Sequence, residues 1–209
     1  LKTFFTALLL LCSTVTIAQK YVVDGVAYNI SSEAEKTAEV TFLGNYYSST
    51  PYTGNVVIPD TMYLDYKTYD NISESLSSYN SDFTYESLTM DVNAGDVLTF
   101  DYSVSITNSG PVVTISIDDA EILNTSRSTS YSTRYTFPST GRSTLMISIE
   151  KEETGNAPAS VTLKNIKITG TTYKYAVKSI GGDAFKKSTG LKSVVIGNSV
   201  TSIGSSAFS

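Results

Sequence analysis

A phrase near the end of the chain returns 23 residues later, from Val177 to Val200, and this repeat constrains the fold more than any other feature. Residues 177–185 read Val-Lys-Ser-Ile-Gly-Gly-Asp-Ala-Phe, and residues 200–208 read Val-Thr-Ser-Ile-Gly-Ser-Ser-Ala-Phe. A repeat of this period is typical of a solenoid, in which each unit buries an apolar face against its neighbour. Solenoids present extended binding surfaces, so the repeat favours recognition over catalysis.

An earlier phrase resembles part of this repeat region. Residues 54–59 read Gly-Asn-Val-Val-Ile-Pro, and residues 192–197 read Lys-Ser-Val-Val-Ile-Gly. We expect each phrase to form the short strand that one solenoid unit contributes to a continuous sheet. Five apolar residues of one turn are expected to point inward: Leu191, Val194, Ile196, Val200 and Ile203.

Two further pairs of residues recur in the repeats. Phe185 and Phe208 are expected to stack on each other in a ladder. Gly181 and Gly204 recur where we expect the chain to bend tightly, because glycine tolerates backbone conformations that other residues avoid.

The first 18 residues have the pattern of a secretory signal peptide. Lys2 precedes an apolar run, residues 4–12, and Thr16-Ile17-Ala18 supplies small residues before the expected cleavage. The run is too short to cross a bilayer. Cys12, the only cysteine, lies inside it, so the mature chain has no thiol for a disulfide or a metal site. We therefore expect a secreted or cell-surface bacterial protein with no membrane-spanning segment in the mature chain.

The composition favours β-structure and excludes several classes of function. Tyrosine contributes 15 residues, and valine, isoleucine and threonine are abundant. The formal net charge is −5 without a basic stripe, so nucleic acid is not an expected partner. The chain has no histidine, which prevents Ser-His-Asp and Cys-His catalysis. We expect a protein that is not an enzyme and uses no cofactor.

Two acidic clusters are the remaining candidates for chemistry: Asp118-Asp119 with Glu121, and Glu150-Lys151-Glu152-Glu153. A glycosidase needs two carboxylates that face each other across a cleft, whereas adjacent residues of a strand point to opposite faces. We interpret both clusters as solvated turns. Calcium binding is the alternative, although the spaced Asp-x-Asp-x-Asn loop is missing. We predict no metal site.

Residues 19–62 are predicted to form an N-terminal β-hairpin cap and the first solenoid strand. Tyr21-Val22-Val23 and Val26-Ala27-Tyr28 flank Asp24-Gly25, a two-residue hairpin signal. Ala38, Val40 and Phe42 alternate with polar residues and predict another strand.

Residues 65–170 follow the alternation of half-buried strands. Residues 98–106 alternate strictly between apolar and polar side chains, and at least five similar short segments surround them. In the last segment the apolar phase slips at Lys164-Asn165, which predicts a β-bulge. Short strands separated by turn signals predict an antiparallel sandwich.

The repeat phrases resemble the BspA-type leucine-rich repeats, which occur in surface and secreted proteins of Bacteroidetes. The resemblance lies in residues 56–59, 179–185, 191–196 and 202–208. Where that family often has Ser-Gly-Cys-x-x-Leu after the phenylalanine, this chain has Lys-Lys-Ser-Thr-Gly-Leu, without the cysteine. The resemblance implies that residues 171–209 are leucine-rich repeats of a truncated array.

The middle region resembles a jelly-roll module of the carbohydrate-binding type. The resemblance lies in residues 92–102, 141–145 and 161–168. Together the two resemblances imply a mainly β protein, in which an antiparallel β-sandwich (jelly roll) is inserted in a leucine-rich-repeat solenoid with an N-terminal β cap.

Five tyrosines are the candidate ligand-binding residues: Tyr46, Tyr47, Tyr52, Tyr131 and Tyr135. The first three lie in one loop and the last two on one face of a strand. Exposed aromatic rings stack on sugars and are favoured at protein interfaces, whereas packing within the protein is the alternative. We expect non-catalytic adhesion to a host or bacterial surface protein or glycan. The alternative is glycan capture by the β-sandwich.

Overall fold

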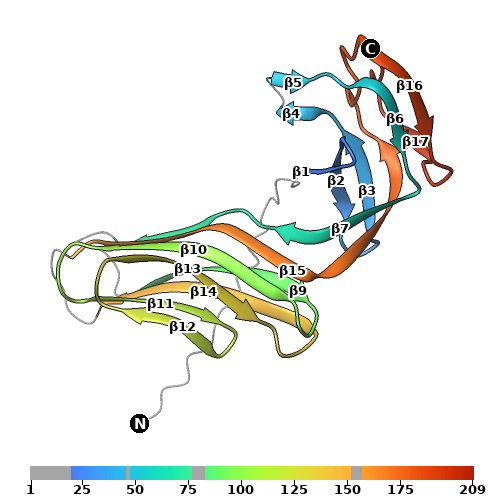
Figure 1. Ribbon diagram of the computed structural model, residues 1–209. Coiled ribbons are helices and arrows are strands. Elements are labelled where there is room, and N and C mark those ends of the chain that lie inside the picture. The colour runs from blue at the N-terminus through green and yellow to red at the C-terminus, as the bar shows by residue number, and fades with distance from the viewer. Residues whose placement is uncertain (1–19, 46–47, 77–82, 152–156) are drawn as a thin grey trace. The chain divides into compact units, whose positions relative to one another are not determined.

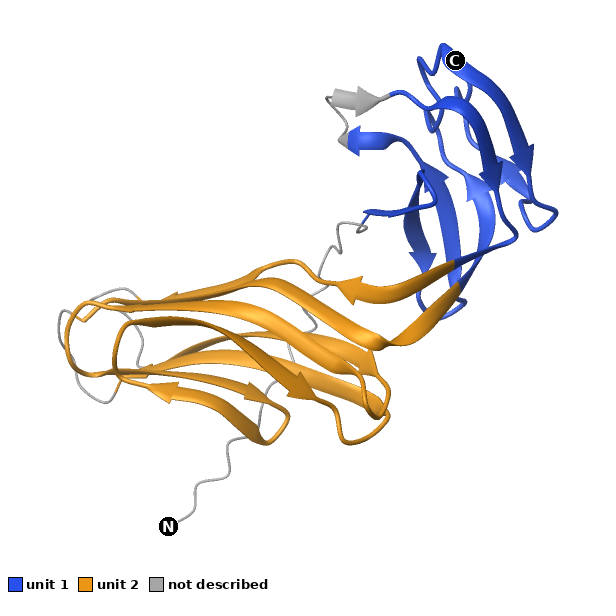
Figure 2. Ribbon diagram, viewed as in Figure 1, with its two compact units in different colours: residues 1–62, 175–209 blue, residues 63–174 orange. Residues whose placement is uncertain are grey.

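The computed structural model describes residues 20–45, 48–76, 83–151 and 157–209, and every regular element in them is a β-strand (Figure 1). The mainly β composition predicted above is confirmed. The predicted signal peptide, residues 1–18, lies outside the described residues. The chain divides into two compact units (Figure 2): unit 1 comprises residues 1–62 and 175–209, and unit 2 comprises residues 63–174. Within the described parts, no helix is long and apolar enough to cross a membrane.

Unit 1 begins with a hairpin and continues into parallel strands. Its strands are β1 (Lys20–Val23), β2 (Val26–Ser32), β3 (Thr37–Thr41), β4 (Leu43–Asn45), β5 (Ser48–Thr50), β6 (Thr53–Ile58), β16 (Gly190–Ile196) and β17 (Ser202–Ile203), with the end of β15 (Ala159–Ile180). Asp24 and Gly25 join β1 to β2 with φ angles of 49° and 78°. Both central residues of the turn are left-handed, so the predicted two-residue hairpin is confirmed.

The strands of the repeat phrases pair in parallel. In one sheet, Val40 of β3 pairs with Ile180 of β15, and Ile180 pairs with Ile203 of β17. In a second sheet, β6 pairs with β16, and Val56 lies opposite Val194. Both Val-Val-Ile phrases therefore form short strands, as predicted, and the structure pairs the two strands with each other.

The turns that follow β15 and β17 also lie against each other. The rings of Phe185 and Phe208 stack with their centroids 5.0 Å apart and their planes within 5°. The backbone N–H of Phe185 donates to the carbonyl oxygen of Ala207 at 2.7 Å. The predicted phenylalanine ladder is confirmed.

Gly181 and Gly204 recur for a different reason from the expected tight bend. Positive φ angles fall instead on Asp183 and Ser206, at 58° and 55°. A Cβ atom on Gly204 would lie 2.5 Å from the nitrogen of Gly182 and 2.8 Å from the carbonyl carbon of Gly181. Glycine is needed here because the two backbones approach closely.

The apolar residues expected to point inward are covered unevenly. Leu191, Val194 and Val200 are half-buried, whereas Ile196 and Ile203 are 38% and 54% exposed. Among the described strands, β16 pairs only with β6 and β17 only with β15. One edge of each strand is therefore uncovered, and this leaves the two isoleucines accessible.

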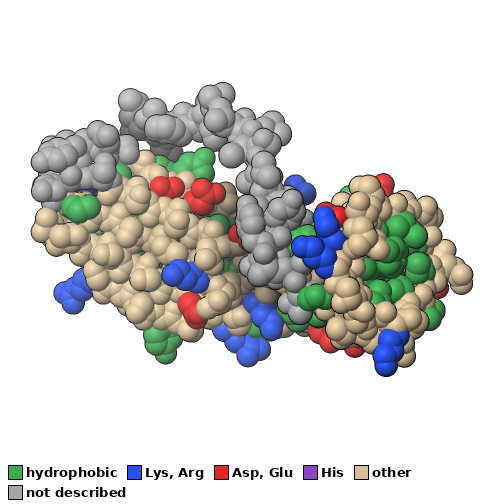
Figure 3. Space-filling model, turned by 90° about the horizontal axis from the view of Figure 1, so that it is seen from above, with side chains coloured by type: hydrophobic (Ala, Val, Ile, Leu, Met, Phe, Trp, Pro, Cys, Tyr) green, Lys and Arg blue, Asp and Glu red, His purple; other side chains and the backbone are tan. Residues whose placement is uncertain are grey.

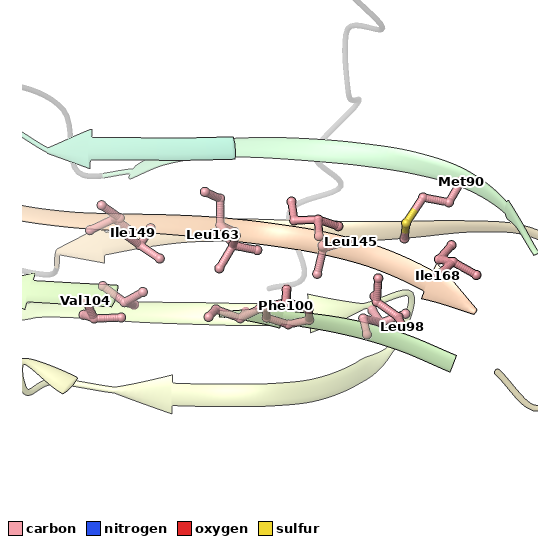
Figure 4. Close-up of a cluster of buried hydrophobic side chains, with 14 of the residues drawn as sticks. Met90, Leu98, Phe100, Val104, Leu145, Ile149, Leu163 and Ile168 are labelled. Atoms are coloured by element: carbon pink, nitrogen blue, oxygen red, sulfur yellow. The ribbon is translucent and has the colours of Figure 1, made fainter. Parts of the chain in front are cut away.

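Unit 2 consists of two antiparallel sheets with a shared core. Its strands are β8 (Ile72–Leu76), β9 (Phe83–Val92), β10 (Val97–Ile106), β11 (Pro111–Ile117), β12 (Ala120–Thr125), β13 (Thr129–Thr136) and β14 (Gly141–Lys151), with most of β7 (Thr61–Thr68) and β15. One sheet has the order β8-β15-β10-β13, and the other has the order β9-β14-β11-β12. Side chains of both sheets meet in one buried cluster, which includes Phe100, Leu145 and Leu163 (Figure 4). This arrangement agrees with the predicted antiparallel sandwich.

A β-bulge in β15 resets which side chains face the core. Lys164 pairs with Asp101 and Lys167 pairs with Thr99, so two residues of β15 lie opposite Phe100. Asn165 has a φ of 54°. The buried residues of β15 therefore change phase, from Val161 and Leu163 before the bulge to Ile166 and Ile168 after it. The predicted bulge is confirmed.

A buried carboxylate fixes the turn between β9 and β10. Asp96 is 1% exposed and accepts hydrogen bonds from the backbone N–H of Asn93 at 2.8 Å and from the Thr171 hydroxyl at 2.7 Å. The Tyr173 hydroxyl donates to the same carboxylate at 3.3 Å. These hydrogen bonds satisfy the buried polar atoms of the Asp96 side chain and connect this turn to β15.

We predict that Gly204→Ala destabilises the protein by about 1–3 kcal/mol, because the added methyl group meets backbone atoms that cannot move aside. Urea unfolding followed by circular dichroism measures the loss. Ser205→Ala, a change at the adjacent exposed position, is the control and should unfold as the wild type does. Equal midpoints for the two variants would contradict the close-approach explanation.

A second prediction concerns the bulge. Asn165→Val should lose about 1–2 kcal/mol of unfolding free energy, because a β-branched residue fits the left-handed conformation poorly. Asn165→Gly accepts that conformation and should lose less. Both variants are compared by urea unfolding, and a valine variant as stable as the glycine variant would show that the bulge does not require the positive φ.

Candidate functional site

The sheet formed by β6 and β16 presents an outward row of side chains in register. Asn55 lies opposite Ser193 and Val57 lies opposite Val195. The Ser193 hydroxyl donates to Oδ1 of Asn55 at 2.9 Å. Val57 and Val195 are 61% and 58% exposed because side chains alternate along a strand, and the neighbouring Val56 is buried. We call these four residues, Asn55, Val57, Ser193 and Val195, the repeat row.

Unit 1 exposes more apolar surface than the repeat row alone. Within the repeats, Ile196, Ile203 and Phe208 are exposed in addition to Val57 and Val195. In Figure 3, hydrophobic side chains gather on the part of unit 1 that faces the viewer. Contiguous exposed apolar surface is a usual mark of an interaction site.

Tyr52, one of the predicted ligand-binding residues, is a packing residue, and that prediction is corrected. Its side chain is 2% exposed, and its ring lies 4.6 Å from the ring of Phe185. The hydroxyl donates to the carbonyl oxygen of Thr41 at 2.6 Å and accepts from the backbone N–H of Ala27 at 2.9 Å. Burial raises the pKa of Tyr52 to about 12, so the hydroxyl stays protonated and can donate at neutral pH. Tyr46 and Tyr47 lie outside the described residues.

The two predicted tyrosines on β13, Tyr131 and Tyr135, differ in how far they are exposed. Tyr131 is 72% exposed. Tyr135 is half-buried, packs against the core and meets Phe137 edge to face at 5.3 Å. Only Tyr131 therefore offers a ring to an external ligand, and its role stays a prediction.

Sequence reasoning missed the aromatic pair of β9. Phe83 and Tyr85 are 52% and 59% exposed, and their ring centroids lie 5.8 Å apart with planes tilted by 35°. The signal was present in the alternation of the strand. Leu88, Met90 and Val92 occupy even positions and turn towards the core, so odd-numbered aromatic residues point to the outer face.

In the first acidic cluster, the structure uses Asp118 to connect a turn to the neighbouring strand. Asp118 lies in the turn between β11 and β12, and its carboxylate accepts from the Ser143 hydroxyl at 2.7 Å and from the backbone N–H of Thr144 at 2.8 Å. Glu152 and Glu153 lie outside the described residues. Where residues are described, no group of three or more potential ligands is placed to hold a metal ion.

The outer face of β13, β10 and β15 carries a different, polar arrangement. The Asp101 carboxylate accepts from the Ser132 hydroxyl at 2.5 Å and from the Asn165 side-chain amide at 2.6 Å. These two hydrogen bonds hold the pKa of Asp101 below its ordinary value. The three residues connect neighbouring strands at the bulge, so we interpret this cluster as one that stabilises the sheet.

Comparison with known proteins finds a similarity in the C-terminal part of the chain. A family model described as "BspA type Leucine rich repeat region (6 copies)" matches residues 156–209, about a quarter of the chain. The C-terminal part of the chain is thus similar to BspA-type leucine-rich repeats. No curated protein matches the sequence.

Several solved structures resemble the chain weakly. A structure titled "CBM4 structure and function" is 11% identical, with 76% of this chain and 81% of that chain covered and a TM-score of 0.28. The g-type lysozyme inhibitor PliG of Aeromonas hydrophila is 13% identical, with 56% and 99% covered and a TM-score of 0.26. Latent PorU of Porphyromonas gingivalis is 12% identical, with 74% and 19% covered and a TM-score of 0.27. At these TM-scores the likenesses carry no argument.

We predict that Tyr52→Phe destabilises the protein by about 1–3 kcal/mol, because it leaves a buried backbone donor and a buried acceptor without their partner. Urea unfolding measures the loss. The aromatic ring is retained, so the loss reports the hydrogen bonds of the hydroxyl alone, and wild-type stability would show that these two hydrogen bonds do not stabilise unit 1.

Proposed function

We propose that this protein is a secreted or cell-surface recognition protein that binds host or bacterial surface molecules without performing chemistry. The observation that carries the proposal is the repeat row, in which two exposed valines lie in register beside an amide and a hydroxyl. Apolar side chains flanked by polar groups are the usual composition of a recognition surface. The family match over residues 156–209 supports the same function.

We further propose that the parallel strands of unit 1 are successive coils of a leucine-rich-repeat solenoid, with residues 19–62 as its N-terminal cap. Two observations favour this interpretation. Val40, Ile180 and Ile203 are neighbours in three adjacent parallel strands, and Ile180 and Ile203 are separated by the 23-residue period. The pattern of residues 1–18 favours export, and the type of repeat favours a Bacteroidetes source.

For unit 2 we propose a jelly roll of about residues 65–170 that is inserted in the solenoid. The strand orders support this topology. If the eight strands β8 to β15 are numbered one to eight, the sheet β8-β15-β10-β13 has the order 1-8-3-6. The sheet β9-β14-β11-β12 has the order 2-7-4-5. This interleaving is the arrangement of two Greek keys in an eight-stranded jelly roll.

Glycan capture by the β-sandwich is the second candidate function. The exposed pair of Phe83 and Tyr85 favours it, because aromatic rings on a flat sheet face can stack on sugars. The two functions use different units of the chain and can be measured separately.

The test of the first function is adhesion of the labelled full chain to immobilised host cells and bacterial cells. The double variant Val57→Glu, Val195→Glu should bind at least about tenfold more weakly, because it places unpaired charges at the centre of the interface. Val22→Glu, at an exposed valine of β1, is the matched control and should bind as the wild type does.

Two outcomes contradict this proposal. Unchanged adhesion of the double variant would remove the repeat row from the binding surface. Hydrolysis of a polysaccharide by the purified wild-type chain would overturn the non-catalytic function.

A further inference from the structure

The outer face of the sheet β9-β14-β11-β12 carries two large aromatic side chains where solvated polar residues are usual. Phe83 and Tyr85 are each more than half exposed, although both belong to a regular strand of the sandwich. Their tilted rings are 5.8 Å apart and together form a continuous apolar surface. Leaving two such rings in water costs free energy, so their exposure points to a ligand.

The strand register places polar groups directly beside these rings. In β14, Glu150 lies opposite Phe83 and Ser148 lies opposite Tyr85. Directly paired residues of antiparallel strands share a face of the sheet, and adjacent strands lie about 5 Å apart. The Glu150 carboxylate is exposed and borders the aromatic pair within the reach of a ligand that covers the rings, whereas Ser148 is buried, with 9% of its surface exposed.

The next strand extends this polar border. Thr114 of β11 lies opposite Ser148, and Asn124 of β12 lies opposite Thr114. The row of Tyr85, Ser148, Thr114 and Asn124 crosses the whole sheet, and it spans about 14 Å at the usual strand spacing. A ligand of two or three linked rings would match that length.

The chemistry of the face selects the class of ligand. A pyranose has an apolar face of C–H groups that stacks on an aromatic ring, and its edge carries hydroxyl groups that donate to carboxylates and exchange hydrogen bonds with hydroxyls and amides. The carboxylate of Glu150 repels an anionic sugar, and the flanking Ser148 and Thr114 carry no charge. The face therefore fits a neutral oligosaccharide.

We propose that Phe83 and Tyr85 form a stacking platform for a neutral glycan, with the exposed carboxylate of Glu150 accepting hydrogen bonds from its hydroxyl groups. This inference rests on the second function proposed above, glycan capture by unit 2. It assigns that function to the outer face of β9 and β14, away from the predicted Tyr131 on β13.

The experiment titrates the full chain with neutral gluco-, manno- and xylo-oligosaccharides and with a uronic-acid oligosaccharide by isothermal titration calorimetry. The wild type should bind at least one neutral series and should bind the anionic probe more weakly. Phe83→Ala and Tyr85→Ala should each weaken that binding at least tenfold, and Glu150→Gln should weaken it several-fold. Tyr63→Ala removes another exposed ring of unit 2 and should bind as the wild type does. Urea unfolding of each variant separates lost binding from lost folding.

The possible failures are distinguishable. If the wild type binds none of the neutral probes, glycan capture and the platform both fall. If it binds and the Phe83 and Tyr85 variants bind equally well, glycan capture stands and the platform falls. Loss of binding in Tyr131→Ala alone would move the site to β13. If sedimentation shows a wild-type dimer that both alanine variants dissociate, the rings are an interface between two copies and the platform falls.

Discussion

Side chains of a strand point alternately to its two faces. In the long strand β15, the buried positions switch between odd and even residue numbers, and each switch requires a local irregularity of the backbone. Strand β15 has 22 residues, and its buried positions change phase between Leu163 and Ile166 and again between Ile168 and Tyr173. The left-handed residue Asn165 lies at the first change, and Gly170, with a φ of 128°, lies at the second. Since β15 supplies side chains to the buried interior of each unit, both cores depend on these local departures from regular backbone.

The two units use strand pairing in different ways to create accessible surface. In unit 1, parallel pairing brings residues far apart in the sequence into identical positions, so Val57 and Val195 repeat the same exposed side chain on neighbouring strands. In unit 2, the antiparallel register of β9 and β14 places Glu150 opposite Phe83, so an aromatic ring borders a carboxylate. The first arrangement repeats the same kind of side chain along a surface. The second places aromatic and charged side chains together in a small area.

Much of the fold could be predicted because the responsible signals are local. The Asp24-Gly25 hairpin, the bulge at Lys164-Asn165 and the stacked Phe185 and Phe208 each follow from a few neighbouring residues or one period. The candidate site was harder to predict because the residues next to an aromatic side chain in the sequence do not reveal whether that side chain is buried or exposed. Tyr52 is buried by partners from elsewhere in unit 1, including Phe185, which no local pattern indicates. The outward position of Phe83 and Tyr85 could have been predicted, because they alternate with Leu88 and the other core-facing residues of β9. The polar residues opposite them could not, because they depend on the register between β9 and β14.

The polar cluster at the bulge favours the charged form of Asp101 in the folded chain. The pKa of Asp101 is lowered in the folded chain by the hydrogen bonds from Ser132 and Asn165, so folding favours the charged carboxylate. Its contribution to stability is complete above the ordinary aspartate pKa of about 4 and is lost only as the pH falls through the lowered folded value. In mildly acidic solution the Asp101 carboxylate therefore keeps its charge and both hydrogen bonds between neighbouring strands.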